Sequence, residues 1–269
     1  YRSVRVYGQE VNPITSAIAR MNLYLHGVTE FSIQKGDTLS EPKFIKNGQL
    51  ERFNVVLANP PYSIKTWNRE KFAHDVWSRN ILGTPPQGRA DYAFIQHILA
   101  SMDEKNGRCA ILLPHGVLNR LEEREMRAEL VKLDWLDCIL GIGKNLFFNS
   151  PMEACVLIAN RNKPASHRGK VLFVAARHLV ERKNGESYLT DDHIRLLAKT
   201  YHDFEPVEGL AAVVTNEAIQ GQKNSLAVNR YVRCVKGDSL ELDLPGMCSA
   251  WRDAARMTEE AVSAFTKLV

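Results

Sequence analysis

One short segment combines residue types that could act on a flat ligand with polar edges. Asn59 ends an apolar run, and the next three residues are Pro60, Pro61 and Tyr62. A strand cannot continue through two prolines, because each lacks an N–H group and has a fixed φ. The chain is therefore expected to leave its sheet here and to present an amide, two rigid carbonyl groups and an aromatic ring together. A rigid turn packed by Tyr62 is the structural alternative.

An exocyclic amine such as adenine N6 is a chemical target that fits this set. Its lone pair is delocalised into the ring, so the nitrogen is a poor nucleophile. Acceptors aimed at its N–H bonds, namely the Asn59 side-chain oxygen and the Pro60 carbonyl, would pull the nitrogen toward tetrahedral geometry and stabilise its developing positive charge. Tyr62 would stack on a base that has left its duplex. We therefore predict Asn59, Pro60, Pro61 and Tyr62 as the catalytic element.

Two carboxylates stand at the ends of other apolar runs. Glu10 could accept two ribose hydroxyls, as acidic residues do in nucleotide-binding folds, or it could favour the N-terminus of the helix that follows. Asp37, in the sequence Gly-Asp-Thr-Leu, could bind the amino group of a cofactor adenine or cap the next turn. Considered alone, Asp37 fits the cap better, and Glu10 fits both interpretations equally. His115 is interpreted as a turn histidine, since no Ser or Cys nucleophile is placed to use it.

Strand and helix patterns alternate along the chain and must position these residues. Strands are expected at 4–8, 30–37, 53–61, 108–116, 136–143, 153–161 and 170–176, and helices at 13–27, 89–102 and 121–133. Such alternation, with nearly continuous apolar strands, indicates an α/β fold with a doubly wound, mainly parallel sheet. Glu10, Asp37 and Asn59 fall at the carboxyl ends of strands, where such sheets bind ligands. The last two strands lack a crossover helix, so a local antiparallel pair is expected there.

The segment from Lys65 to Arg89 interleaves basic and aromatic residues. Its members are Lys65, Arg69, Lys71, Arg79 and Arg89, with Trp67, Phe72 and Trp77. Such groups can meet phosphates and stack on bases, and a solvated loop with a few buried anchors explains the composition equally well. The helix at 121–133 is expected to be a solvated one, with an i,i+4 pair between Glu123 and Arg127.

Composition and patterning bound the remaining possibilities. The 269 residues include 35 basic and 31 acidic ones, a net charge of +4 that permits contact with nucleic acid without requiring it. No apolar run approaches the roughly 18 residues that span a bilayer. The five cysteines form no Cys-x-x-Cys pair, so neither a zinc site nor a disulfide framework is expected, and a reducing cytoplasm fits best. The pattern loosens near residue 206, so we predict a core at 1–205 and a C-terminal segment at 206–269, with a last helix capped by Thr258.

Six blocks occur in an order that carries a resemblance. They are YGQEVNPITSAIARMNLYLHG (7–27), GDTL (36–39), VVLANPPYS (55–63), GRADYAFIQHIL (88–99), GRCAILLPHGVL (107–118) and NLFFNSPMEACVLIANRNK (145–163). Over residues 1 to about 235 the chain resembles the modification (M) subunit of type I restriction-modification systems, an N6-adenine DNA methyltransferase. The Asn-Pro-Pro-Tyr element is shared by amino-methyltransferases in general, whereas the first block is much more specific to M subunits.

The resemblance implies roles for individual residues. Glu10 matches the acidic position that holds the ribose of S-adenosylmethionine, and Asp37 matches the carboxylate near the cofactor adenine. Residues 59–62 match the catalytic element around the flipped adenine, with Asn59 also near the cofactor. Phe94 lies in a region that lines the cofactor pocket in the resembled proteins. The implied fold is a Rossmann-like methyltransferase sheet with an antiparallel edge, and no metal is implied.

One departure from the resembled family is large. Those proteins have a first strand that ends in a Gly-rich loop of the Asp-Pro-Ala-Cys-Gly-Ser-Gly-Gly kind, ahead of the segment that opens here. That loop holds the methionine part of the cofactor, and it is absent from these 269 residues. A sheet without this strand is expected to leave backbone groups unpaired and an apolar flank exposed. We therefore expect the fragment alone to have no measurable methyltransferase activity.

The resemblance also implies partners. M subunits act on duplex DNA together with a specificity (S) subunit, which reads the sequence, and often with a restriction (R) subunit. The helix from Thr258 would belong to an S-docking region. Two alternatives stay open: methylation of a glutamine side chain in a protein, whose amide nitrogen suits the same element, and an inactive module that binds DNA or the S subunit without cofactor affinity.

Overall fold

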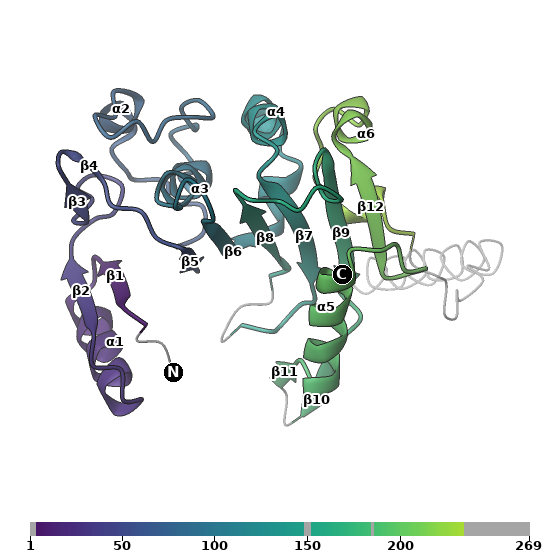
Figure 1. Cartoon of the computed structure of the whole chain (residues 1–269), viewed down its shortest axis with the longest axis horizontal. Helices are drawn as coiled ribbons and strands as arrows, with labels where there is room; N and C mark the ends of the chain where they lie inside the picture. Colours follow the sequence, from purple (N-terminus) through teal and green to yellow (C-terminus); the bar gives the residue numbers. More distant parts are fainter. Residues whose placement is uncertain (1–3, 148–151, 184–185, 234–269) are drawn as a thin grey trace, which may run out of the picture. The chain divides into compact units, whose positions relative to one another are not determined.

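A mixed six-stranded β-sheet is the main element of the fold (Figure 1). The computed structural model describes residues 4–147, 152–183 and 186–233, which belong to one compact unit. The strand order is β12-β9-β7-β8-β6-β5. The strands are β5 (Val55–Ala58), β6 (Arg108–Pro114), β7 (Leu136–Ile142), β8 (Ala154–Asn160), β9 (Lys170–Ala176) and β12 (Ala211–Thr215).

The strand directions confirm an α/β sheet with an antiparallel edge strand, but the expected mainly parallel sheet is wrong, because three of the five strand pairings are antiparallel. β5 is parallel to β6 and β7 to β9, whereas β8 is antiparallel to β6 and β7, and the edge strand β12 is antiparallel to β9. The predicted direct pairing of the strands at 153–161 and 170–176 is wrong, because β7 lies between them. The connection between them crosses the start of β7, where Lys163 Nζ donates to the carbonyl groups of Leu136 and Lys170.

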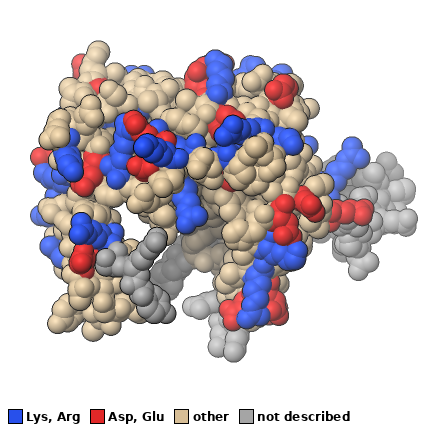
Figure 2. Space-filling view, in the orientation of Figure 1, with Lys and Arg blue, Asp and Glu red and all other residues tan. Residues whose placement is uncertain are grey.

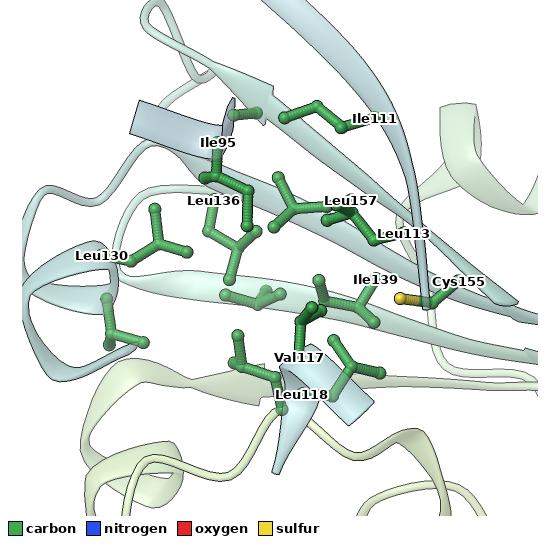
Figure 3. Close-up of a cluster of buried hydrophobic side chains, with 14 of the residues drawn as sticks. Ile95, Ile111, Leu113, Val117, Leu118, Leu130, Leu136, Ile139, Cys155 and Leu157 are labelled. Carbon is green, nitrogen blue, oxygen red and sulfur yellow. The ribbon is translucent and has the colours of Figure 1, made fainter. Parts of the chain in front are cut away.

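Three helices cover one face of this sheet and form the main core with it. They are α3 (Asp91–Ala100), α4 (Arg124–Lys132) and α6 (Asn216–Gly221). Figure 3 shows side chains of α3, α4 and the central strands meeting in one apolar cluster, to which Ile219 of α6 also belongs. Its fully buried members include Ile95, Ile111, Leu113, Leu118, Leu130, Ile139, Leu157 and Ile219. This burial fixes α3, whose first turn faces the candidate catalytic segment.

The opposite face of the sheet is covered only in part. There α5 (Asp191–Asp203) packs Leu197 and Tyr201 near Cys138 of β7 and neighbouring strands. Side chains of β5 on this face stay exposed, Val55 by 48% and Leu57 by 76%. Within the described residues, β5 is also an edge strand, paired with β6 alone. The expected exposure of an apolar flank is thus confirmed.

A separate parallel pair, β1 (Val6–Glu10) and β2 (Phe31–Lys35), flanks α1 (Pro13–Leu25) in sequence. The predicted cap is present, since the Asn12 side chain accepts from the backbone N–H groups of the next turn and Pro13 takes the first helical position. The apolar stripe of α1 is exposed by 62–76%. Its residues are Ile14, Ile18, Met21, Tyr24 and Leu25.

Short elements complete the described chain. They are β3 (Ile45–Lys46), β4 (Gln49–Leu50), α2 (Arg69–Ala73), β10 (Glu181–Lys183), β11 (Glu186–Tyr188) and the 3₁₀ turns η1 (His115–Leu118), η2 (Leu121–Glu123) and η3 (Val228–Arg230). The rings of Tyr7, Phe44 and Phe53 stack edge-on or tilted at 5.2–6.0 Å and join β1 to the hairpin β3–β4. No helix within the described ranges is long and apolar enough to cross a bilayer.

The predicted solvated helix at 121–133 differs from the observed segment. Only residues 124–132 form an α-helix. Glu123 is fully buried and binds Arg120, while Arg127 is 2% exposed and donates to the carbonyl groups of Val117 and Asn224. The predicted Glu123–Arg127 pair is therefore wrong. A charged composition suggested solvent, but this helix packs beneath the segment that follows β12.

Residues beyond 205 continue the same compact unit. β12 pairs with β9, and Ile219, Leu226 and Val228 are buried in the main core. The division that the sequence suggested near residue 206 lies inside this unit, which extends to Arg233. The helix predicted from Thr258 lies outside the described residues.

This arrangement predicts unequal costs for two isoleucine truncations. Ile219→Ala in α6 removes a side chain that is 0% exposed and should lower the free energy of unfolding by about 2–4 kcal/mol through a core cavity. Ile194→Ala in α5 is the matched control, since Ile194 is 52% exposed and should cost under about 1 kcal/mol. Urea denaturation measures both. Equal costs would place the segment after 205 outside the core.

Candidate active site

The Asn-Pro-Pro-Tyr element forms the turn by which the chain leaves β5. Asn59 and Pro61 are exposed, Pro60 is buried and Tyr62 is half-buried. From the residues that the structure describes, no hydrogen bond reaches the Asn59 side chain or the Pro60 carbonyl. Both acceptors are therefore free for a ligand, as the chemistry of an exocyclic amine requires. The packed-turn alternative accounts for Pro60 but not for the exposed amide.

A shallow hollow opens beside Asn59 on the uncovered face of the sheet. Its volume is about 400 Å³, and its walls come from β5, β6 and β8. They are Leu57, Ala58, Asn59, Ala110, Leu112 and Val156. Burial raises the pKa of Tyr62, so this phenol stays neutral at physiological pH. The site thus combines an apolar wall, a neutral aromatic ring and uncompensated acceptor groups.

The turn continues into a network that sequence reasoning missed. The backbone N–H of Ser63 donates to Asp91 Oδ1 at 2.7 Å, and Arg120 donates to Asp91 Oδ2 at 2.6 Å. Asp91 begins α3 in the block GRADYAF, so its position at a helix start was visible in the sequence. Its partner 28 residues earlier was not, because that contact depends on the tertiary fold.

Both predicted cofactor carboxylates cap turns in the structure. Glu10 Oε1 accepts from the backbone N–H of Asn12 at 2.7 Å. Asp37 Oδ1 accepts from Leu39 N at 2.9 Å, and Asp37 Oδ2 accepts from the Ser40 hydroxyl at 2.7 Å. These contacts are the structural alternatives that the sequence offered for both residues. A carboxylate has about four acceptor sites, so each group retains capacity for a ligand hydroxyl or amine.

The two carboxylates lie at the same end of the β1–β2 pair. Glu10 stands opposite Lys35 in the parallel register, and Asp37 follows two residues later. Gln9 fixes the loop after Asp37, because its amide donates to the Glu41 carbonyl and accepts from Lys43 N. Its place beside Glu10 in the sequence was the only available signal for this role.

Arg79 belongs to the basic segment but does not face solvent. Its side chain is 1% exposed and pairs with Asp75, also 1% exposed, at 2.6 Å. The same guanidinium donates to the carbonyl groups of Thr38 and Leu39 at 2.9 and 2.7 Å. The interpretation of Arg79 as a phosphate contact is therefore wrong. Arg79 is instead one of the buried anchors that the alternative interpretation expected. It ties the segment 63–90 to the loop that contains Asp37.

His97 completes the surroundings of Arg79. Burial, and then the charge of Arg79, lower the pKa of His97 to about 3. The neutral ring can therefore accept from Arg79 through Nδ1, at 3.3 Å. Phe94, one turn earlier on α3, packs half-buried in a cluster with Leu39 and Phe72. α3 thus brings Phe94 beside the Asp37 loop, as a role at the cofactor pocket requires.

The remaining basic residues of the segment 65–89 lie at or near the surface. Lys65 and Lys71 are exposed, and Arg89 is half-buried. Arg69 is half-buried and donates to the Pro85 carbonyl at 2.8 Å. Figure 2 shows Lys and Arg interspersed with Asp and Glu on the face it presents. Within the described part of the chain, no group of three or more His, Cys, Asp or Glu could hold a metal ion.

A family model described as N-6 DNA Methylase matches residues 1–239. The chain belongs to this family. The "Type I restriction enzyme HindI methylase subunit" of Haemophilus influenzae is 32% identical over 240 residues, 86% of this chain and 52% of that protein. The "Type I restriction enzyme MjaVII methylase subunit" of Methanocaldococcus jannaschii is 31% identical over 272 residues, 96% of this chain and 46% of that protein.

A solved structure agrees with these relatives of the N-6 DNA methylase family. The type I restriction-modification methyltransferase subunit of Streptococcus thermophilus superposes with a TM-score of 0.79 at 32% identity, over 86% of this chain and 49% of that one. The resemblance to M subunits and the methyltransferase fold are both confirmed. The chain spans about half the length of the relatives it matches.

The buried pair predicts a large cost for removing its cation. Arg79→Met leaves Asp75 buried without a counter-charge and frees two carbonyl groups, so the free energy of unfolding should fall by about 3–5 kcal/mol. Arg5→Met is the control, because Arg5 pairs with Glu30 where the two side chains are 70% and 50% exposed, and such pairs contribute at most about 1 kcal/mol. Urea unfolding of both variants measures these two costs. Similar urea midpoints for Arg79→Met and Arg5→Met would contradict the structural role assigned to Arg79.

Glu123 predicts a pH dependence of stability. Its Oε2 is buried without a hydrogen-bond partner among the described residues, and burial raises the pKa of Glu123 from 4.5 to about 7. The folded state keeps a proton that the unfolded state releases between these values, so stability falls as pH rises through this window. At about 1.36 kcal/mol per pKa unit, a difference of about 2.5 units corresponds to about 3 kcal/mol.

Glu123→Gln should therefore flatten the unfolding free energy between pH 5 and 8 and stabilise the protein at pH 8. Glu129→Gln is the control in the helix α4 that follows, since Glu129 is 46% exposed and forms a surface pair with Lys132. Urea unfolding at several pH values provides the measurement. A slope unchanged by Glu123→Gln would show that Glu123 is ionised in the folded state.

Proposed function

We propose that this chain forms part of the catalytic core of a methyltransferase that modifies adenine N6 in duplex DNA, as the modification subunit of a type I restriction-modification system. The observation that carries the proposal is the turn after β5. It presents the Asn59 amide oxygen and the Pro60 carbonyl without partners among the described residues, next to the half-buried ring of Tyr62. The family match and the methylase-subunit relatives support it.

S-adenosylmethionine, when bound, supplies a methyl group on a sulfonium centre, whose C–S bond breaks as the N6–C bond forms. Asn59 and Pro60 act on the acceptor. Each takes a hydrogen bond from the adenine amino group, which turns the nitrogen lone pair out of conjugation and stabilises the charge that develops on N6. Tyr62 stacks on the extruded base. The surplus proton on N6 becomes acidic after methylation begins and passes to water, so no strong base is required.

The residues of the β1–β2 end fit the cofactor. Glu10 would hold the ribose hydroxyls, Asp37 would accept from the adenine amino group, and Phe94 would line the pocket. Glu10 has one carboxylate oxygen without a partner among the described residues, and both oxygens of Asp37 retain a lone pair beyond their turn contacts. The set is acidic and aromatic, which suits a nucleoside and offers no ligand cluster for a metal.

Partners follow from the same proposal. The enzyme would act on DNA with a specificity subunit that selects the sequence and with a restriction subunit where one exists, in the cytoplasm. The family match does not favour the two alternatives, glutamine methylation or an inactive binding module.

Asn59→Ala in the intact methylase subunit, assembled with its specificity subunit, is the direct test. We expect kcat for methyl transfer to DNA to fall by about 10²–10³-fold, because one of the acceptors at the reacting amine is lost. Affinity for S-adenosylmethionine, measured by calorimetry, should stay within about threefold. Asn54→Ala is the control, since Asn54 is exposed and its side chain donates to Asn106, outside the turn that follows β5.

Two outcomes would overturn the proposal. Methyl incorporation into a protein rather than into DNA would favour the glutamine alternative. Full turnover by the Asn59→Ala enzyme would show that the Asn59 amide does not act at the reacting centre.

A further inference from the structure

Ser63, the residue after Tyr62, has an unusual backbone conformation. Its φ is 51°, in the left-handed region that residues other than glycine seldom adopt. Such a conformation persists only where the surrounding structure holds it. Because Ser63 sets the direction in which the chain leaves the catalytic turn, whatever holds Ser63 also sets the position of the turn.

One buried carboxylate holds both polar groups of Ser63. The backbone N–H donates to Asp91 Oδ1 at 2.7 Å, and the Ser63 hydroxyl donates to Asp91 Oδ2 at 3.2 Å. The Asp91 side chain is 1% exposed, so water does not compete for these bonds. Asp91 opens α3, whose apolar side is fully buried in the main core. The turn is thereby bound to a helix that is packed into the main core.

Arg120 aligns this carboxylate. Its NH1 group donates to Asp91 Oδ2 at 2.6 Å and to Glu123 Oε1 at 3.3 Å, and its NH2 group donates to the Ser63 hydroxyl at 3.2 Å. Gly116 makes room for the guanidinium, since a Cβ atom there would lie 2.6 Å from Arg120 Nε. Three segments therefore meet at Ser63: the turn after β5, the start of α3 and the η1–η2 region.

We propose that Asp91, aligned by Arg120, is a positioning residue that holds Ser63 in its left-handed conformation and so fixes Asn59 and Tyr62 for the acceptor base. This inference rests on the proposed function for its catalytic consequence. Asp91 touches neither the base nor the cofactor in this role. It acts through one backbone N–H, so its loss misplaces the turn without removing an acceptor group.

The kinetic test compares Asp91→Asn and Asp91→Ala in the intact methylase subunit with its specificity subunit. Asp91→Ala should lower kcat by about 100-fold, the loss typical of a displacement near 1 Å at a reacting centre. Asp91→Asn keeps an acceptor oxygen for the Ser63 N–H and should lose about tenfold. KM for S-adenosylmethionine should stay within about threefold in both, which a general loss of structure would not allow.

Asp103→Ala is the matched control. Asp103 also caps a turn, because its Oδ1 accepts from the backbone N–H groups of Lys105 and Asn106, but it does so away from the catalytic segment. We expect wild-type kcat from this variant. Gly116→Ala is a second probe, since it displaces Arg120 and leaves Asp91 and Ser63 intact. It should lower kcat by about tenfold while the Ser63 amide stays protected.

Hydrogen exchange at the Ser63 amide gives a readout that does not depend on turnover. Protection should be lost in Asp91→Ala and kept in Asp103→Ala, with exchange in β6 and β7 unchanged. If the wild-type enzyme fails to methylate DNA but shows this exchange pattern, the proposed function falls and the positioning role stands. Unchanged Ser63 exchange, or an unchanged kcat in an active Asp91→Ala enzyme, overturns the inference.

Discussion

The buried guanidinium of Arg79 is the interaction on which the arrangement of the site most depends. It neutralises Asp75 and donates to two backbone carbonyl groups in the Asp37 loop. A neutral His97 on α3 completes the contacts. Without this cation, the long segment 63–90 and the loop that holds the predicted cofactor carboxylate would have few polar contacts in common. Every N–H donor of a buried arginine must find an acceptor. The Arg79–Asp75 pair therefore also fixes the distance between the segment 63–90 and the Asp37 loop.

α3 links the two halves of the candidate site. Its first residue, Asp91, binds the turn that carries Asn59, and Phe94 packs beside Leu39 in the Asp37 loop. The helix itself is held by apolar burial against β6 and its neighbours. The turn after β5 and the Asp37 loop belong to different sheets, but both contact α3. This helix therefore sets the position of the acceptor side of the site relative to the cofactor side.

Local covalent constraints made part of this structure predictable from sequence. Two consecutive prolines end a strand, because neither has an N–H group to donate. Asn12 and Pro13 start a helix, because the Asn12 side chain accepts from the first backbone N–H groups and Pro13 has a helical φ. The pairing of strands was harder to predict from sequence, since β8 lies between β6 and β7 rather than beside β9. The buried charges were least accessible of all. Arg79 donates to a carbonyl group 40 residues earlier, and Asp91 accepts from Ser63, 28 residues earlier. Such partners depend on the tertiary fold, so the sequence left the role of Arg79 open and gave no role to Asp91.

The buried Asp91–Arg120 pair stiffens the candidate catalytic turn. A free acceptor oxygen at Asn59 is useful only if the backbone behind it cannot relax to satisfy that oxygen from within. Asp91 and Arg120 supply this resistance from the exit of the turn, and the β5–β6 ladder supplies it from the entrance. Charges that are removed from water hold their partners more firmly than neutral groups do. The stiffness of the turn and the exposure of its amide are therefore two consequences of the same buried network.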